Sequence, residues 1–228
     1  MIDRFRYVPA TKDHADKILD FLINQFGKYE PINASTKATK DDLIDLFRDT
    51  AHHGYTNDKY STLVYDGNRL IAMCLCSLCS TETMDAPFPA QIDVKNHDFA
   101  EDIVKGPYKQ HKANQIIIFV RFLEDTLSQM LSKHKFMKMD ILCVHKDYMG
   151  QGLGKELNRW AMQNAQAEGC EYIATAATAA ASQAIFAKSG WKILYEVPYA
   201  SYRENGNPVF QNLHDGCQSA KVVAAKLY

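Results

Sequence analysis

The segment that most constrains the fold runs from residue 139 to residue 169. It begins with a short apolar run, 139–144, around a single aspartate, which predicts a buried strand. Three glycines follow at every second position, at 150, 152 and 154. Residues 155–168 have helical composition, and Gly169 stands where a C-terminal capping glycine is expected. The segment is therefore predicted to form a strand, a glycine turn and a helix.

This glycine turn suits a phosphate or pyrophosphate group. Closely spaced glycines let backbone N–H groups point into the turn, and the positive end of the following helix dipole adds to the attraction. The turn is not a nucleoside-triphosphate loop, because no Gly-Lys-Ser/Thr ends it at the required spacing. A dinucleotide fold is disfavoured because its turn should come early, whereas this one comes two-thirds of the way along. The alternative is a turn that only joins strand to helix.

Length and composition limit the classes of protein and of binding partner that remain. A chain of 228 residues suits one domain, 1–228, and a net charge of −1 implies no broad basic surface for nucleic acid. No apolar run approaches the length of a membrane span, and the N-terminus lacks a signal core, so no membrane partner is expected. The six cysteines form no paired Cys-x-x-Cys sets, which favours a reducing cytoplasm and no metal. We expect a monomer or a weak homodimer.

Hydrophobic periodicity predicts an alternation of strands and helices along the whole chain. Residues 28–33 are predicted to be a polar link, and residues 80–113 an irregular excursion with one short helix. Strands are predicted at 5–8, 61–65, 69–79, 139–144, 171–178, 191–197 and 219–226, and helices at 11–27, 40–52, 114–133, 155–168 and 179–188.

Residues 144–154 resemble the acetyl-CoA signature of the GNAT N-acetyltransferases, Gln/Arg-x-x-Gly-x-Gly/Ala, with a departure at Met149. The resemblance implies an α/β GNAT fold, in which a mixed, partly parallel central sheet is flanked by helices and acetyl-CoA lies in a cleft beside the central strand. It also implies that backbone amides of the turn hold the pyrophosphate. The cofactor-binding residues so implied are Leu142, Cys143, Val144, Met149, Gly150, Gln151, Gly152, Leu153, Gly154, Lys155 and Phe186.

Further segments resemble the insect-type arylalkylamine N-acetyltransferases, which include dopamine acetyltransferases. Glu30-Pro-Ile-Asn is similar to their Glu-Pro-Leu-Asn segment, and Thr178, Ser182 and His214 follow their C-terminal motifs in order and spacing. The departures are Thr178 for a serine, Trp191 for a phenylalanine and Leu213 for a proline. The resemblance implies acetyl transfer to the primary amine of a small arylalkylamine, of the dopamine, serotonin, tryptamine or tyramine class.

The chemistry of acetyl transfer assigns roles to these residues. An alkylamine near neutral pH is protonated and must lose a proton before it attacks a thioester. Glu30 is predicted to be the general base, with its pKa raised by partial burial. Thr178 and Ser182 are predicted to orient water or to hydrogen-bond the departing thiolate, and His214 to relay protons. Structural alternatives are a loop-capping Glu30, a helix-capping Ser182 and a solvent-exposed His214.

Three readings of the function remain open at this stage. Many GNAT enzymes have a general-acid tyrosine where this chain has Phe186, which has no proton to give, so the general acid is unassigned. Aromatic walls, from Tyr7, Phe26 or Tyr29, would favour an arylalkylamine, whereas acidic walls would favour a polyamine or agmatine-like substrate. The loss of Gln/Arg at Met149 supports a third reading, a module that binds acyl-CoA without turnover.

Overall fold

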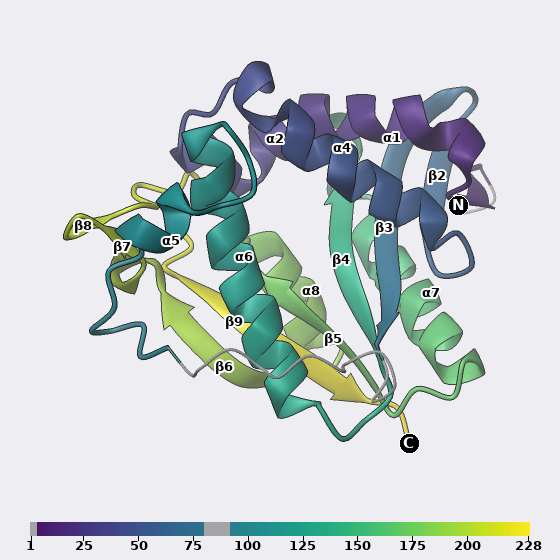
Figure 1. Cartoon of the computed structure of the whole chain (residues 1–228). Helices are drawn as coiled ribbons and strands as arrows, with labels where there is room; N and C mark the ends of the chain where they lie inside the picture. Colours follow the sequence, from purple (N-terminus) through teal and green to yellow (C-terminus); the bar gives the residue numbers. More distant parts are fainter. Residues whose placement is uncertain (1–3, 80–91) are drawn as a thin grey trace.

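Seven strands form a single sheet in the order β1-β2-β3-β4-β5-β9-β6 in the computed structural model, which describes residues 4–79 and 92–228 (Figure 1). Neighbouring strands are antiparallel except for β4 and β5, which are parallel. The predicted mixed, partly parallel sheet is therefore confirmed. The strands are β1 (Arg6–Pro9), β2 (Thr62–Asp66), β3 (Arg69–Cys79), β4 (Phe136–Val144), β5 (Tyr172–Ala177), β6 (Lys192–Pro198) and β9 (Ser219–Lys226), and β7 (Arg203–Glu204) pairs with β8 (Asn207–Pro208) in a separate ribbon.

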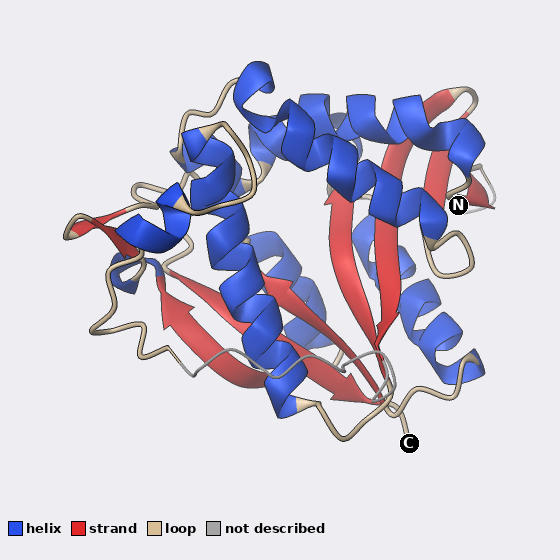
Figure 2. Ribbon diagram, viewed as in Figure 1, coloured by secondary structure: helices blue, strands red, loops and turns tan. Residues whose placement is uncertain are grey.

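Helices cover both faces of the sheet (Figure 2). They are α1 (Ala15–Phe21), α2 (Gly27–Tyr29), α3 (Pro31–Ser35), α4 (Lys40–Thr56), α5 (Ala100–Val104), α6 (His111–Met130), α7 (Leu153–Ala167) and α8 (Ala180–Lys188). On one face, α6 packs on β5, β6 and β9 and against α4, while α7 packs on β3, β4 and β5 from the other. In α6 the fully buried Phe119, Leu123 and Leu127 recur every four residues, which places one apolar stripe against the sheet. In the described part of the chain, no helix combines the length and apolar character of a membrane span.

The two parallel strands, β4 and β5, pair only at their beginnings within the described chain. Phe136–Lys138 pairs with Tyr172–Ala174, and no strand pairing between them follows. Immediately beyond, the Thr175 hydroxyl donates to the carbonyl oxygen of Met139 at 2.7 Å, so a side chain takes the place of the next ladder bond. The strands then separate toward the end of β4 (Figure 1). The sheet therefore opens in the middle, and the inner edge of β4 is left without a strand partner.

The segment before the second long helix differs from the prediction. Gly27 was expected to end the first helix, but its φ of −61° is helical, and the chain continues through a π-helical turn, Leu22–Phe26, into α2. The expected polar link at 28–33 was wrong, because Glu30 is the N-cap of the next helix, α3. Pro31 is pre-organised for the first helical position, and the Glu30 carboxylate accepts from the Asn33 N–H, which together favour a new helix here.

Other differences concern boundaries. Helix α4 continues four residues beyond the predicted end at His52, and β4 begins at Phe136 rather than Met139 because the buried Phe136 and Met137 extend its core run. The β7–β8 ribbon was not predicted at all. One short helix, α5, does lie within the 80–113 excursion, and residues 80–91 of that excursion lie outside the described residues.

Candidate active site

Glu30 lies at the junction of α2 and α3, and its side chain connects this N-terminal segment to the residue that follows β5. Its Oε2 accepts a hydrogen bond from the Asn33 N–H at 2.8 Å, and its Oε1 accepts one from the Thr178 hydroxyl, also at 2.8 Å. Thr178 directly follows β5 and is 148 residues away in sequence. Glu30 is only 8% exposed. A carboxylate held by two donors at this point is fixed in position beside the opening between β4 and β5.

Burial raises the pKa of Glu30 to about 7. The hydrogen bonds from Asn33 and Thr178 favour the ionised form and oppose this shift, whereas the nearby Asp215 carboxylate adds to it. Near neutral pH both protonation states of Glu30 are therefore populated. A group with such a pKa can accept a proton from a substrate and release it again, which suits a general base.

The raised pKa of Glu30 predicts that the unfolding free energy of the protein depends on pH. Because the folded state binds the Glu30 proton more tightly than an unfolded glutamate does, stability falls as pH rises from the unfolded pKa of about 4.3 to the folded value of about 7. Glutamine does not titrate, so the unfolding free energy of Glu30→Gln relative to that of the wild type should rise by about 2.5 kcal/mol between about pH 5 and about pH 8. Urea unfolding of both proteins at about pH 5 and about pH 8 measures the effect. A difference in unfolding free energy that is the same at both pH values would contradict it.

Glu30 and Thr178 line a cavity of about 100 Å³ on the side of the sheet covered by α4 and α6. This volume is below the roughly 300–1,000 Å³ of pockets for drug-sized ligands, so the cavity suits a small molecule. Its other walls are apolar side chains from helix and sheet and a smaller set of charged ones. The apolar walls include Phe26, Phe47, Ile116, Val120 and Ile141, and the charged groups are Glu124 and Asp140.

The glycine turn opens the N-terminus of α7. Gly150 and Gly152 have φ of 78° and 86°, in the left-handed region that favours glycine, and Gly152 is the N-cap of α7. At Gly154, a Cβ would lie 2.8 Å from Cδ1 of Ile185, so the missing side chain lets α7 approach α8. Gln151 and Lys155 are exposed, and Leu153 is buried as the first residue of the helix. An open helix N-terminus behind a left-handed turn fits a pyrophosphate group.

The end of β4 presents alternate side chains to opposite faces of the sheet. Leu142 and Val144 pack in the core on the α7 side, whereas Cys143 packs in the core on the α4 and α6 side. Burial, and then the charge of Glu30, raise the pKa of the Cys143 thiol to about 12. Cys143 therefore lies on the side of Glu30. Phe186 is buried in α8 with its ring 4.5 Å from that of Trp191.

The other two predicted catalytic residues, Ser182 and His214, lie within hydrogen-bonding distance of backbone carbonyl oxygens. The Ser182 hydroxyl donates to the carbonyl oxygen of Ala179 at 2.9 Å, within the first turn of α8. The ring nitrogen Nε2 of the exposed His214 lies 3.1 Å from the carbonyl oxygen of Tyr29, one residue before Glu30. Among the described residues, neither side chain hydrogen-bonds Glu30. Of the predicted set, the structure thus brings Thr178 into contact with Glu30.

Sequence reasoning missed several charged residues around the cavity. Asp215 accepts from the Ala180 N–H at 2.8 Å at the start of α8, and it is close enough to influence Glu30. Glu124 and Asp140 line the cavity itself. Asp140 did leave a signal, since it is the one carboxylate inside the apolar run that predicts β4. The others come from distant parts of the chain, and nothing in their local pattern marks them.

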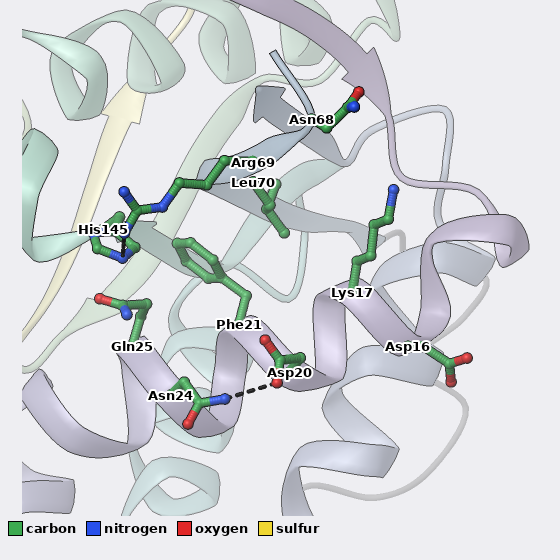
Figure 3. Close-up of a pocket in the computed structure, with 10 residues that line it drawn as sticks. All are labelled: Asp16, Lys17, Asp20, Phe21, Asn24, Gln25, Asn68, Arg69, Leu70 and His145. Atoms are coloured by element: carbon green, nitrogen blue, oxygen red, sulfur yellow. Dashed lines mark hydrogen bonds between the residues drawn. The ribbon is translucent and has the colours of Figure 1, made fainter. Parts of the chain in front are cut away.

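A larger cavity, of about 490 Å³, lies between the first helical segment and the β2–β3 turn (Figure 3). On its wall the Arg69 guanidinium lies 2.7 Å from Nε2 of His145, and Asn24 donates to Asp20 at 2.7 Å. Arg69 also pairs with Asp147 at 3.3 Å, just before the glycine turn. This cavity shares no lining residue with the one that holds Glu30. It therefore adds no group to the candidate active site.

The separating parallel strands and the helix N-terminus opened by glycines are the arrangement that the resemblance to the GNAT N-acetyltransferases predicts for a cleft beside the central strand. The model of the acetyltransferase (GNAT) family matches residues 19–191. The chain belongs to this family, whose members use acetyl-CoA, and it is an acetyl-CoA-dependent N-acetyltransferase.

Solved structures with the same fold cover nearly the whole chain. Arylalkylamine N-acetyltransferase 2 from Aedes aegypti superposes with a TM-score of 0.77 at 17% identity, covering 98% of this chain and 99% of that one. The Drosophila melanogaster polyamine N-acetyltransferase, which forms N-acetylagmatine, gives 0.68 at 14% identity, with 98% and 100% covered. No curated protein sequence matched the chain. At such identities the likeness establishes the fold and leaves the amine substrate unresolved.

Proposed function

We propose that this protein transfers the acetyl group of acetyl-CoA to the primary amine of a small arylalkylamine, of the dopamine, serotonin, tryptamine or tyramine class, with Glu30 as general base. The observation that carries the proposal is the buried Glu30 carboxylate, hydrogen-bonded by Thr178, in the wall of a small cavity where β4 and β5 separate. The rings of Phe26 and Phe47 and the aliphatic side chains of α6 support an aromatic substrate, because they offer it an apolar wall.

In the proposed reaction, proton transfer takes place at Glu30, in the cavity on the α4 and α6 side of the opening between β4 and β5. The Glu30 carboxylate attracts the incoming ammonium and accepts its proton, and the raised pKa of about 7 makes it a stronger base than an ordinary glutamate. The Thr178 hydroxyl keeps the carboxylate oriented, and the Tyr199 hydroxyl donates to the Thr178 carbonyl oxygen, which holds the end of β5 in place. The neutral amine then attacks the thioester carbonyl carbon of acetyl-CoA, whose pyrophosphate is bound at the glycine turn. A C–N bond forms, the C–S bond breaks, and CoA leaves as a thiolate that takes up a proton.

Two carboxylates favour a second candidate substrate. Glu124 and Asp140 line the same cavity as Glu30, and an acidic wall suits a polyamine or an agmatine-like amine. The two candidates differ in the tail of the amine and share the proton transfer at Glu30. The aryl candidate is favoured by the larger number of apolar wall residues.

A thiol-release assay with acetyl-CoA and a panel of amines tests the proposal. We expect turnover with dopamine, serotonin, tryptamine and tyramine, and lower kcat/KM with agmatine and spermidine. The highest kcat/KM for agmatine or spermidine would move the assignment to the second candidate. Tight binding of acetyl-CoA without thiol release on any amine would contradict both, and would favour a non-catalytic acyl-CoA-binding module.

Met149→Arg restores the residue type that the family signature prefers. Met149 is 57% exposed beside the glycine turn, so an arginine there would be solvated and would attract the CoA phosphates weakly. We expect acetyl-CoA to bind a few-fold tighter at low salt, with the gain lost at about 0.5 M salt. The acetyl-CoA KM at both salt concentrations measures this. Weaker binding in the variant would show that the side chain at 149 points away from the phosphates or obstructs them.

A further inference from the structure

The segment that leads into the glycine turn, Lys146–Tyr148, is held from the β2–β3 hairpin. The Tyr148 hydroxyl donates to Oδ2 of Asp66, the last residue of β2, at 2.9 Å. Asp66 pairs across the hairpin with Arg69, whose guanidinium lies 5.6 Å from the centroid of the Tyr148 ring. The two residues at the end of the hairpin therefore contact the same side chain, just before Gly150.

Further contacts of Asp66 and Tyr148 fix the geometry of this hydrogen bond. Arg4 pairs with the same oxygen of Asp66 at 2.6 Å, and Arg4 and Tyr148 together hold the pKa of this carboxyl below its usual value. The Tyr148 ring packs edge-on against Phe5, with the ring centroids 6.1 Å apart. Tyr148 is half-buried, whereas residues 149–152 after it are exposed. Tyr148 is therefore the point at which the chain is anchored before it enters the turn.

The glycine turn itself has few contacts that would fix its conformation. Within the described chain, Gly150 and Gln151 form no hydrogen bond to other backbone groups, and a Cβ at Gly150 or Gly152 would meet no atom within 4 Å. Glycine has more conformational freedom than other residues, so ordering such a turn around a ligand costs more free energy. A turn that is already held at its start loses less of that freedom on binding, which raises its affinity for the ligand.

Other contacts between the hairpin and this segment lie farther from the turn or are weaker. The His145 N–H donates to the Ile71 carbonyl oxygen at 2.7 Å, well before the turn begins. Arg69 pairs with Asp147 at 3.3 Å, but both side chains are more than half exposed, and an ion pair in solvent contributes little. The hydrogen bond from the tyrosine to an ionised carboxylate is therefore the main tie to the hairpin close to the turn.

We propose that Asp66 is a positioning residue for acetyl-CoA: through Tyr148, it holds the start of the glycine turn in the conformation that receives the CoA pyrophosphate. The inference rests on the proposed function in one respect, the binding of the pyrophosphate at this turn, and it is independent of the amine. Asp66 lies outside the acetyl-CoA signature at 144–154, and the hairpin brings it there. Because Asp66 acts on cofactor binding and not on the reacting atoms, its effect belongs to the KM for acetyl-CoA and not to kcat.

Tyr148→Phe keeps the ring and removes the hydroxyl, so it tests this hydrogen bond alone. With the best amine of the panel, the KM for acetyl-CoA should rise by about 3- to 10-fold, the usual worth of one hydrogen bond, with kcat unchanged. S-acetylpantetheine carries the same thioester without the pyrophosphate, so its kcat/KM should equal that of the wild type. Asp66→Ala should have the same effects, and the double variant should raise KM no further, since both changes remove one interaction. Calorimetric titration of acetyl-CoA repeats the comparison without an amine, and Kd should rise by the same factor.

Tyr60→Phe is the matched control, since the Tyr60 hydroxyl lies 3.5 Å from Oε2 of Glu168, at the opposite end of α7 from the turn. Its KM for acetyl-CoA should equal that of the wild type. An unchanged acetyl-CoA KM and Kd in Tyr148→Phe or in Asp66→Ala, or an equal loss with S-acetylpantetheine, would overturn the inference while the proposed function stands. Equal wild-type kcat/KM for the two thioesters would overturn the binding of the pyrophosphate at the turn, and the inference with it. Tyr148→Phe decides the question even if Asp66→Ala does not fold.

Discussion

Replacing Glu30 by glutamine should lower kcat by about 10²–10⁴-fold, the usual worth of a general base, with little change in the KM for acetyl-CoA. Glutamine keeps the size of the side chain, and its amide oxygen can still accept from the Asn33 N–H that starts α3. What it loses is the ability to take a proton from the substrate ammonium. Steady-state kinetics with the best amine of the panel measure the effect.

Two hydroxyl variants serve as controls for this result. Thr178→Ala should lower kcat less than Glu30→Gln does, because Thr178 acts on the substrate through Glu30. Loss of its hydrogen bond should also raise the pKa of Glu30 further. Ser182→Ala should lower kcat least of the three, since the Ser182 hydroxyl donates to the carbonyl oxygen of Ala179, the N-cap residue of its own helix. A Glu30→Gln enzyme with near-normal kcat would leave Glu30 with only its role as the cap of α3.

Gly152→Asp should raise the KM for acetyl-CoA by roughly 10- to 100-fold. Gly152 is the exposed N-cap of α7 with φ of 86°, where the proposed pyrophosphate site lies. Two charges 4 Å apart interact by about 4 kcal/mol near a protein surface, and solvent around an exposed turn reduces this. Titration of acetyl-CoA against the folded variant measures the change.

Gly152→Asn separates charge from backbone strain. Asparagine and aspartate adopt the left-handed conformation with similar ease, and a Cβ at this position meets no atom within 4 Å. The asparagine variant should therefore bind acetyl-CoA much better than the aspartate variant, and the gap should narrow at high salt. Equal acetyl-CoA affinities of the two variants would contradict the assignment of the CoA phosphates to this turn.

The part of the site made by one continuous segment could be predicted from sequence. The run from β4 through the glycines to α7 is specified by short-range signals: an apolar run, residues that permit left-handed φ, and helical periodicity. The turn at Gly150 and Gly152 has the predicted backbone conformation. The β2–β3 hairpin around Gly67 was predicted for the same reason.

The parts that depend on tertiary contacts could not be predicted. Glu30 was predicted to lie in a polar link, because Gly27 is typical of a helix end, whereas in the structure the helix continues through Gly27. The contact between Glu30 and Thr178 joins residues 148 positions apart, and no local pattern encodes it. The bulge at Asp140 depends on the register of β3 against β4, so the direction of that carboxylate follows only from the assembled sheet.

The pH dependence of kcat/KM, measured for the wild type and for Glu30→Gln with the same amine, tests the central claim most directly. Because the base must be ionised to accept a proton, wild-type kcat/KM should fall as pH drops, with a midpoint near the pKa of Glu30, about 7. This acidic limb should be absent from the glutamine variant, whose side chain does not titrate. A variant that retains the same limb at the same pH would show that another group controls turnover, and would contradict the assignment of Glu30 as the general base.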